Sequence, residues 1–226
     1  MIIPLNKLSE IKIKLIKDKK FWVTTSIIAL FYAIWTLRGW YSYAVLETGS
    51  FRDWFLFLSK YPSWIVLAIG LLWYNFGKDW LQKSGLRKFN FQVLGWAAVA
   101  ILAHLIYLFF PSSSGFGVYN FKFDFSINLL AREIINGFTE ELLFRATFQP
   151  FLEKYFGKLK SNILQAILFS AIHWCWWLFA GEFTISGAIY IAILGFFWGW
   201  IRQKSDSIYG TTIAHTVHNL ILGWLG

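Results

Sequence analysis

Seven apolar stretches follow one another along this chain of 226 residues, and each is close to the length that a helix needs to cross a bilayer. Lipid offers no hydrogen-bond partner to the backbone, so a spanning segment must be a helix or part of a closed barrel. Stretches this long predict helices. They lie at about residues 21–46, 54–76, 91–110, 127–148, 163–179, 185–201 and 209–225. We therefore predict an all-α fold, a polytopic transmembrane helical bundle of about seven spans.

The second stretch is the least regular of the seven, because Lys60 and Pro62 interrupt it and leave an apolar run from residue 64 to residue 76. That run is short for a span. The composition supports the membrane assignment nevertheless, since 57% of the residues are hydrophobic and only 15% are charged. Soluble domains carry about 25% charged residues.

The formal net charge of +9 would suit a nucleic-acid partner, but the lysines and arginines fall in short loops between apolar stretches. Their alternation follows the positive-inside rule. We expect no nucleic acid and a lipid bilayer as the immediate partner. The alternation predicts an integral, multi-pass protein of the cell membrane with its amino terminus in the cytoplasm.

The same pattern divides the chain into four parts: a basic cytoplasmic segment at 1–20, amino-terminal transmembrane helices at 21–110, an outer loop at 111–126 and a catalytic four-helix transmembrane core at 127–226. The outer loop begins with a Pro-Ser-Ser-Ser-Gly run, which is typical of a break between helices. Gly195 and Gly199 form a GxxxG pair on the sixth helix. Such a pair predicts close helix packing.

Ionisable side chains inside membrane helices are costly and mark functional sites. At about 1.5 Å per residue, Glu140, His173 and His215 lie roughly 12, 15 and 9 Å from the cytoplasmic ends of their predicted helices. Three helices would thus place polar groups at similar depth. This predicts one shared site, reached from the cytoplasmic side.

Helical spacing separates the roles of these side chains. Glu141 and Arg145 are four residues apart, in the order that favours an ion pair within a helix. Glu140 then points about 100° away from that pair. His215 and Asn219 share a face of the last helix, and His218 can share part of it. His104 stands alone on the third helix, where a packing role is expected.

Three short motifs, in order, each fall within one of these helices. EExxxR is Glu140-Glu141-Leu-Leu-Phe-Arg145, FxxxH is Phe169-Ser-Ala-Ile-His173, and HxxxN is His215-Thr-Val-His-Asn219. With these motifs the chain resembles the CPBP family of intramembrane proteases, the type II CAAX-processing and bacteriocin-self-immunity (Abi) proteins. The resemblance covers the chain from about Arg132 to the carboxy terminus.

The resemblance implies hydrolysis of a peptide bond near the membrane, with a membrane-associated protein or peptide, a lipidated one included, as substrate. Water attack needs a general base, and Glu140 assisted by His173 suits that role. His215 and Asn219 are expected to stabilise the oxyanion. Glu141 and Arg145 are expected to support the site, with the pair fixing the angle of Glu140. Phe169 is expected to pack beneath His173.

Other interpretations stay open. No cofactor is favoured, but Glu140, His173 and His215 would also form a zinc site with an open position, although no HExxH pairing is present. A small proton or ion transporter could use the same residues, although the internal repeat typical of transporters is not found. A non-catalytic membrane scaffold or immunity factor of the same fold is the third alternative.

Overall fold

The computed structural model describes residues 17–87, 89, 91–109 and 126–224. Most of the predicted segments 1–20 and 111–126 lies outside these residues, as does the side chain of His104. The described residues form helices and turns without a strand, which confirms the all-α prediction. The elements are α2 (Lys19–Ala44), α3 (Ser50–Phe76), the short η1 (Gly77–Asp79) and α4 (Trp80–Lys83), α5 (Phe91–Phe109), α6 (Ile127–Glu141), η2 (Leu142–Phe148), α7 (Gln149–Ala180), α8 (Ile185–Ser205) and α9 (Tyr209–Trp224).

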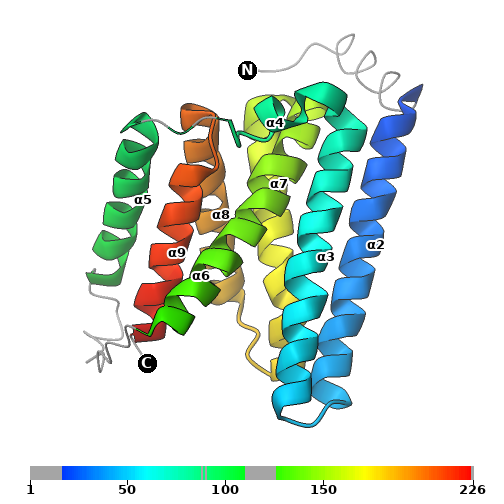
Figure 1. The fold of residues 1–226 in the computed structure, drawn as a ribbon, viewed down its shortest axis with the longest axis vertical. Helices are drawn as coiled ribbons and strands as arrows, with labels where there is room; N and C mark the ends of the chain where they lie inside the picture. The colour runs from blue at the N-terminus through cyan, green and yellow to red at the C-terminus, as the bar shows by residue number, and fades with distance from the viewer. Residues whose placement is uncertain (1–16, 88, 90, 110–125, 225–226) are drawn as a thin grey trace.

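The helices pack as a bundle with α2 and α3 at one edge and α5 at the other (Figure 1). α7 packs against α8 and α2, whereas α9 packs against α6 and α5. The π-helical element η2 lies between α3, α6 and α7. Aromatic residues fill the space around it, with Phe144 against Phe148, Phe169 and Trp64. The centre of the bundle is therefore built where α6 meets α7.

Within the described residues, four stretches are long and apolar enough, by length and composition, to cross a membrane: Lys19–Ala44, Ser50–Lys83, Ile127–Ala180 and Ile185–Ser205. The third has 54 residues, but the chain leaves helical geometry at Gly157, with φ 75° and ψ 173°. A positive φ is readily adopted only by glycine. Figure 1 shows the chain rising through α6 and descending through the rest of α7. The count of about seven spans stays a prediction.

The continuous helix that begins with α6 is longer than the predicted helix of residues 127–148. It continues without a break through η2 into the first turns of α7 and ends at Gly157. The sequence suggested an earlier end because the charged residues after Phe148 resemble a loop. In the structure these residues extend the helix instead, and the next helix begins several residues before the predicted start at 163.

α3 runs without interruption through Lys60 and Pro62, so these residues interrupt the apolar pattern of the second stretch but not its helix. Proline removes one backbone donor and its ring crowds the preceding turn. The donor missing at Pro62 would have bonded to the carbonyl of Leu58, and the neighbouring serine hydroxyls bond to other carbonyls of the same helix. Here the Ser63 hydroxyl donates to the carbonyl of Ser59 at 2.5 Å, and the Ser59 hydroxyl donates to that of Phe55 at 2.5 Å.

The Gly195–Gly199 face of α8 packs closely on α7, which confirms the predicted packing role. A Cβ at Gly195 would lie 3.1 Å from the ring of Phe169 and 3.2 Å from the Cα of Ala166. The close approach exposes two α8 carbonyls to buried amides. Gln165 donates to the Gly195 carbonyl at 2.8 Å, and Gln149 donates to the Gly199 carbonyl at 2.9 Å. These glutamines add hydrogen bonds to the close contact between α7 and α8.

Candidate active site

Glu141 and Arg145 form a buried ion pair where α6 passes into η2. Oε1 of Glu141 lies 3.1 Å from a guanidinium nitrogen of Arg145, and both side chains are 0% exposed. The guanidinium stacks 4.1 Å from the centre of the Phe169 ring and donates to the carbonyl of Gly195 at 3.3 Å. The predicted pair is confirmed. Its position in a π-helix is new, and such elements are frequent at functional sites.

His215 on α9 joins this pair, a contact that the sequence did not predict. Its Nδ1 lies 3.0 Å from Oε1 of Glu141. A carboxylate bound to arginine accepts hydrogen bonds, so we assign the Nδ1 proton to this contact. The ring also stacks on Trp198, with centroids 4.3 Å apart. Glu141 therefore orients two helices, through Arg145 and through His215.

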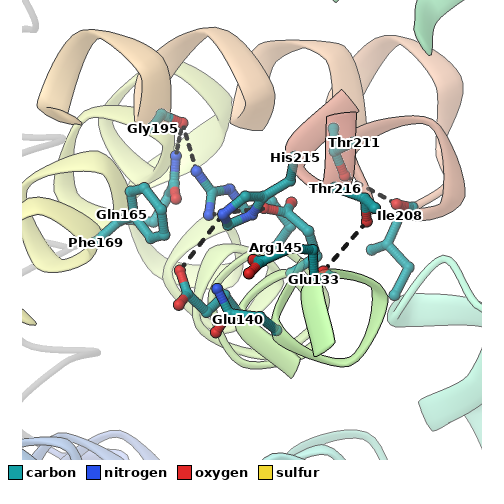
Figure 2. A network of polar contacts seen from close by, with 12 residues as sticks. Glu133, Glu140, Arg145, Gln165, Phe169, Gly195, Ile208, Thr211, His215 and Thr216 are labelled. Atoms are coloured by element: carbon teal, nitrogen blue, oxygen red, sulfur yellow. Dashed lines mark hydrogen bonds and ion pairs between the residues drawn. The ribbon is translucent and has the colours of Figure 1, made fainter. Parts of the chain in front are cut away.

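Glu140 is buried and shares one partner, His215, with Glu141 (Figure 2). Oε1 lies 2.7 Å from Nζ of Lys60, while Oε2 lies 3.7 Å from Nε2 of His215. Among the described residues, Oε2 has no hydrogen-bond partner. The prediction that Glu140 points away from the Glu141–Arg145 pair is thus confirmed. One carboxylate oxygen is held by Lys60, and the other is buried without a hydrogen-bond partner.

Lys60 is the site residue that the sequence analysis missed. It comes from α3, lies next to Glu140 and also donates to Oδ1 of Asn136 at 2.5 Å. The signal was present, because a lysine inside an apolar helix is as costly as a buried carboxylate. In the sequence it interrupts an apolar stretch without a visible partner. The structure shows instead that α3, outside the predicted core at 127–226, contributes to the site.

His173 lies on α7 above Phe169. Its Nδ1 lies 2.9 Å from the carbonyl oxygen of Phe169, and the two rings meet edge to face with centroids 5.1 Å apart. The predicted packing of Phe169 beneath His173 is confirmed. A carbonyl only accepts, so Nδ1 carries the proton and Nε2 of the neutral ring keeps its lone pair. The same applies to neutral His215.

A cavity of about 560 Å³ adjoins these groups. Glu140 and His173 line it together with Lys60, Tyr61 and Asn136. His215 is buried behind Glu140 and does not line the cavity.

Asn219 is half-buried, lies outside that lining, and has no side-chain hydrogen bond among the described residues. His218 is buried on the same helix, with its ring 5.6 Å from that of Trp198. The structure thus brings Glu140, His173 and His215 together and leaves Asn219 apart.

The cavity occupies one end of the bundle. Its outer lining includes Arg38 near the end of α2, Asp53 near the start of α3, Arg132 near the start of α6 and Trp176 near the end of α7. This is the end that carries the turns between α2 and α3 and between α7 and α8 (Figure 1). The cavity therefore lies far from the start of α2.

This placement corrects the predicted depth. Glu140 lies about 24 Å from Phe156, where its continuous helix ends, because this helix is longer than predicted. His173 lies about 22 Å from the start of its own segment after Gly157. A cytoplasmic amino terminus and access from the cytoplasmic side, both predicted, cannot hold together.

The metal alternative has a geometric test. No group of three or more His, Cys, Asp or Glu side chains within the described residues is arranged to hold a metal ion. Glu140, His173 and His215 carry the right atoms, since both rings have Nδ1 engaged and Nε2 available. The ammonium group of Lys60 beside Glu140 is unfavourable for a dication there.

Comparison with known proteins gives one match. Residues 122–221 match the family model described as Type II CAAX prenyl endopeptidase Rce1-like. No curated protein and no solved structure matches the chain. The matched region contains all three motifs and every predicted site residue, whereas Lys60 lies outside it. Residues 122–221 are therefore similar to the Rce1-like type II CAAX prenyl endopeptidases, in agreement with the resemblance to the CPBP family, and the apolar helices support an integral membrane protein.

Proposed function

We propose that the protein is an intramembrane endopeptidase that hydrolyses a peptide bond of a membrane-associated protein or peptide. One observation carries the proposal. Oε2 of Glu140 is buried, has no hydrogen-bond partner among the described residues, and belongs to a side chain that lines the same cavity as His173. An acceptor of this kind beside an imidazole suits the activation of water.

In the proposed reaction, water bound in the cavity gives a proton to Oε2 of Glu140 and attacks the carbonyl carbon of the scissile bond. His173 accepts a hydrogen bond from the same water at Nε2 and orients its lone pair. The proton held by Glu140 then passes to the departing amide nitrogen as the C–N bond breaks. The products are a carboxylic acid and an amine, and Glu140 returns to its starting state.

His215 and Asn219 are the proposed oxyanion donors, and each has a condition. With Nδ1 donating to Glu141, His215 can donate from Nε2 only as an imidazolium. Asn219 reaches the oxyanion only after a shift of its side chain toward the cavity. Glu141 and Arg145 act as positioning residues, because they hold His215 and the end of α6 in place.

We propose the metal-free mechanism over the zinc mechanism. Lys60 already compensates the charge of Glu140, which a bound zinc ion would otherwise do. In the zinc version, Glu140, His173 and His215 would be the ligands, and the ion would polarise the bound water. A strong chelator distinguishes the two mechanisms. Full activity after chelation, with no zinc found in the purified protein by metal analysis, would exclude the zinc mechanism.

We further propose about seven spans in the cell membrane, a core at 127–226 and a cytoplasmic amino terminus. The basic loops support that orientation. The cavity then opens on the outer side, which replaces the predicted cytoplasmic access. A lipidated substrate suits the apolar surroundings of the cavity, where Trp35, Leu56, Phe57 and Trp176 line the wall.

The test is cleavage of a quenched membrane-peptide library by purified protein in liposomes. Glu140→Gln keeps the size of the side chain and removes its basicity, so we expect a loss of at least a hundredfold in kcat, as for other general bases. Glu47→Gln is the matched control, because Glu47 is exposed in the turn before α3. Cleavage by wild type that does not exceed that by Glu140→Gln would refute the enzyme assignment.

A further inference from the structure

The oxyanion donors are the weakest part of the proposed site, because neither His215 nor Asn219 lines the cavity. The carbonyl oxygen of a bound peptide becomes negatively charged when water adds. That charge must meet donors that face the substrate. A donor of this kind in the cavity lining comes from α3, which lies outside the region matched by the family model.

Lys60 has the required position. Its Nζ lies 2.7 Å from Oε1 of Glu140 and 2.5 Å from Oδ1 of Asn136, and the side chain is 17% exposed where it lines the cavity with His173. An ammonium group has three N–H donors. Two of them are used by these contacts. The third is available to a ligand in the cavity.

Its neighbours hold the ammonium group in place. The rings of Trp64 and Tyr61 lie with their centres 5.2 and 5.5 Å from Nζ. Rings at this distance attract a cation through their faces without using a hydrogen bond. The position of Nζ is thus fixed from four sides, by a carboxylate, an amide and two aromatic rings. A fixed donor needs little reorganisation during reaction.

The charge balance of the reaction fits this position. Before attack, the negative charge is on Glu140. When Glu140 takes the proton from water, its charge disappears and an equal charge appears on the carbonyl oxygen of the substrate. A cation beside Glu140 and facing the same cavity is paired before and after this step. The cation stabilises the negative charge of the base before attack and that of the oxyanion afterwards.

We propose that Lys60 is a catalytic residue that donates a hydrogen bond from Nζ to the oxyanion. This inference rests on the proposed peptidase function. It adds a cationic donor from α3 to the residues of the three motifs. His215 then acts behind Glu140, and Asn219 need not reach the substrate.

The experiment compares wild type with Lys60→Met, which keeps the length of the side chain and removes its charge and donors. Removing one oxyanion donor lowers kcat by about 10²–10³-fold with little change in KM. We expect that loss at the plateau of the pH–kcat profile. We also expect a similar loss of affinity for a tetrahedral phosphonate peptide, which mimics the charged intermediate. Binding of an uncleaved substrate analogue should stay within threefold.

A merely structural role predicts another result. If Lys60 only kept Glu140 ionised, Lys60→Met would move the acidic limb of the profile and recover full kcat at higher pH, and phosphonate and substrate affinities would change together. Either outcome overturns the proposal.

Lys60→Gln is the second variant, because the glutamine amide can still donate hydrogen bonds to Glu140 and Asn136. This variant tests the proposal if Lys60→Met does not fold. We expect at least a tenfold loss of kcat. Retention within threefold by either folded variant overturns the proposal. Lys204→Met is the charge control, since Lys204 is exposed at the other end of the bundle. If wild type is active and the Lys60 variants are equally active, this inference alone is refuted. If wild type itself does not cleave the peptides, the peptidase function is refuted.

Discussion

The ion pair between Glu141 and Arg145 offers a direct test of how the site is held. Both side chains are 0% exposed, at 3.1 Å, so removing one partner leaves a buried charge with poor compensation. Breaking such a pair costs about 3–5 kcal/mol. Arg145→Met should therefore lower the free energy of unfolding by about 3–5 kcal/mol. The loss of its bond to the Gly195 carbonyl adds little, because Gln165 still donates there at 2.8 Å.

Glu141→Leu should cost a similar amount, about 3–5 kcal/mol, because Arg145 then becomes the unpaired charge. His215 would also lose its acceptor. The double variant leaves neither charge. A coupling free energy of about 2–3 kcal/mol between the two sites is therefore expected, so that the double variant is much more stable than the sum of the singles implies.

The assay is reversible unfolding in mixed micelles with increasing denaturing detergent, followed by tryptophan fluorescence of the two single variants and the double variant. Replacing Arg145 removes its contact with Phe169 in both the single and the double variant. Replacing Glu141 likewise removes its contact with His215 in both. These losses cancel in the cycle, which leaves the interaction between Glu141 and Arg145. Additive losses would show that Glu141 and Arg145 act independently. A loss under 1 kcal/mol for Arg145→Met would contradict the burial argument.

Three further predictions follow from separate features. Gly199→Ala should destabilise the bundle by about 1–3 kcal/mol, because the new methyl group would collide with side chains of α7, whereas Gly70→Ala, with open space around it, should not destabilise it; equal unfolding curves for the two would contradict this. The hydrogen bond from Tyr155 lowers the pKa of Asp18 in the folded protein, so the stability that it adds is present above pH 3.8 and is lost as the pH falls through the lower folded value. Tyr155→Phe should therefore reduce the dependence of the free energy of unfolding on pH in that window. An unchanged pH dependence would contradict this assignment. With Cys175 replaced, a cysteine at position 53 should react with an impermeant maleimide from outside; labelling from the cytoplasm alone would reverse the orientation.

The predictions from the sequence that were confirmed depend on local patterns. Long apolar stretches predicted the helices, because a helix satisfies its own backbone whatever its neighbours are. Four-residue spacing predicted the contact between Glu141 and Arg145, and Phe169 was expected beneath His173 for the same reason. The GxxxG pair predicted the close contact of α8 with α7.

The helix ends were predicted less well. The charged residues after Phe148 suggested a loop, yet they lie in a helix up to Gly157. Polarity alone does not end a helix when its side chains find partners in the tertiary structure. The error in length became an error of about 12 Å in the depth of Glu140. It also moved the expected opening of the site from the end of the bundle where α2 starts to the opposite end.

The sequence by itself determined that this chain is a helical membrane protein and indicated the side chains of its carboxy-terminal region that form the candidate site. Composition, periodicity and spacing are properties of neighbouring residues, so they can be read along the chain. Only the tertiary structure decided that His215 binds Glu141, that Lys60 pairs with Glu140, and that Asn219 lies away from the cavity. Residues 80 positions apart meet because α3 packs against η2 and α6, and this packing depends on the side chains of the whole bundle.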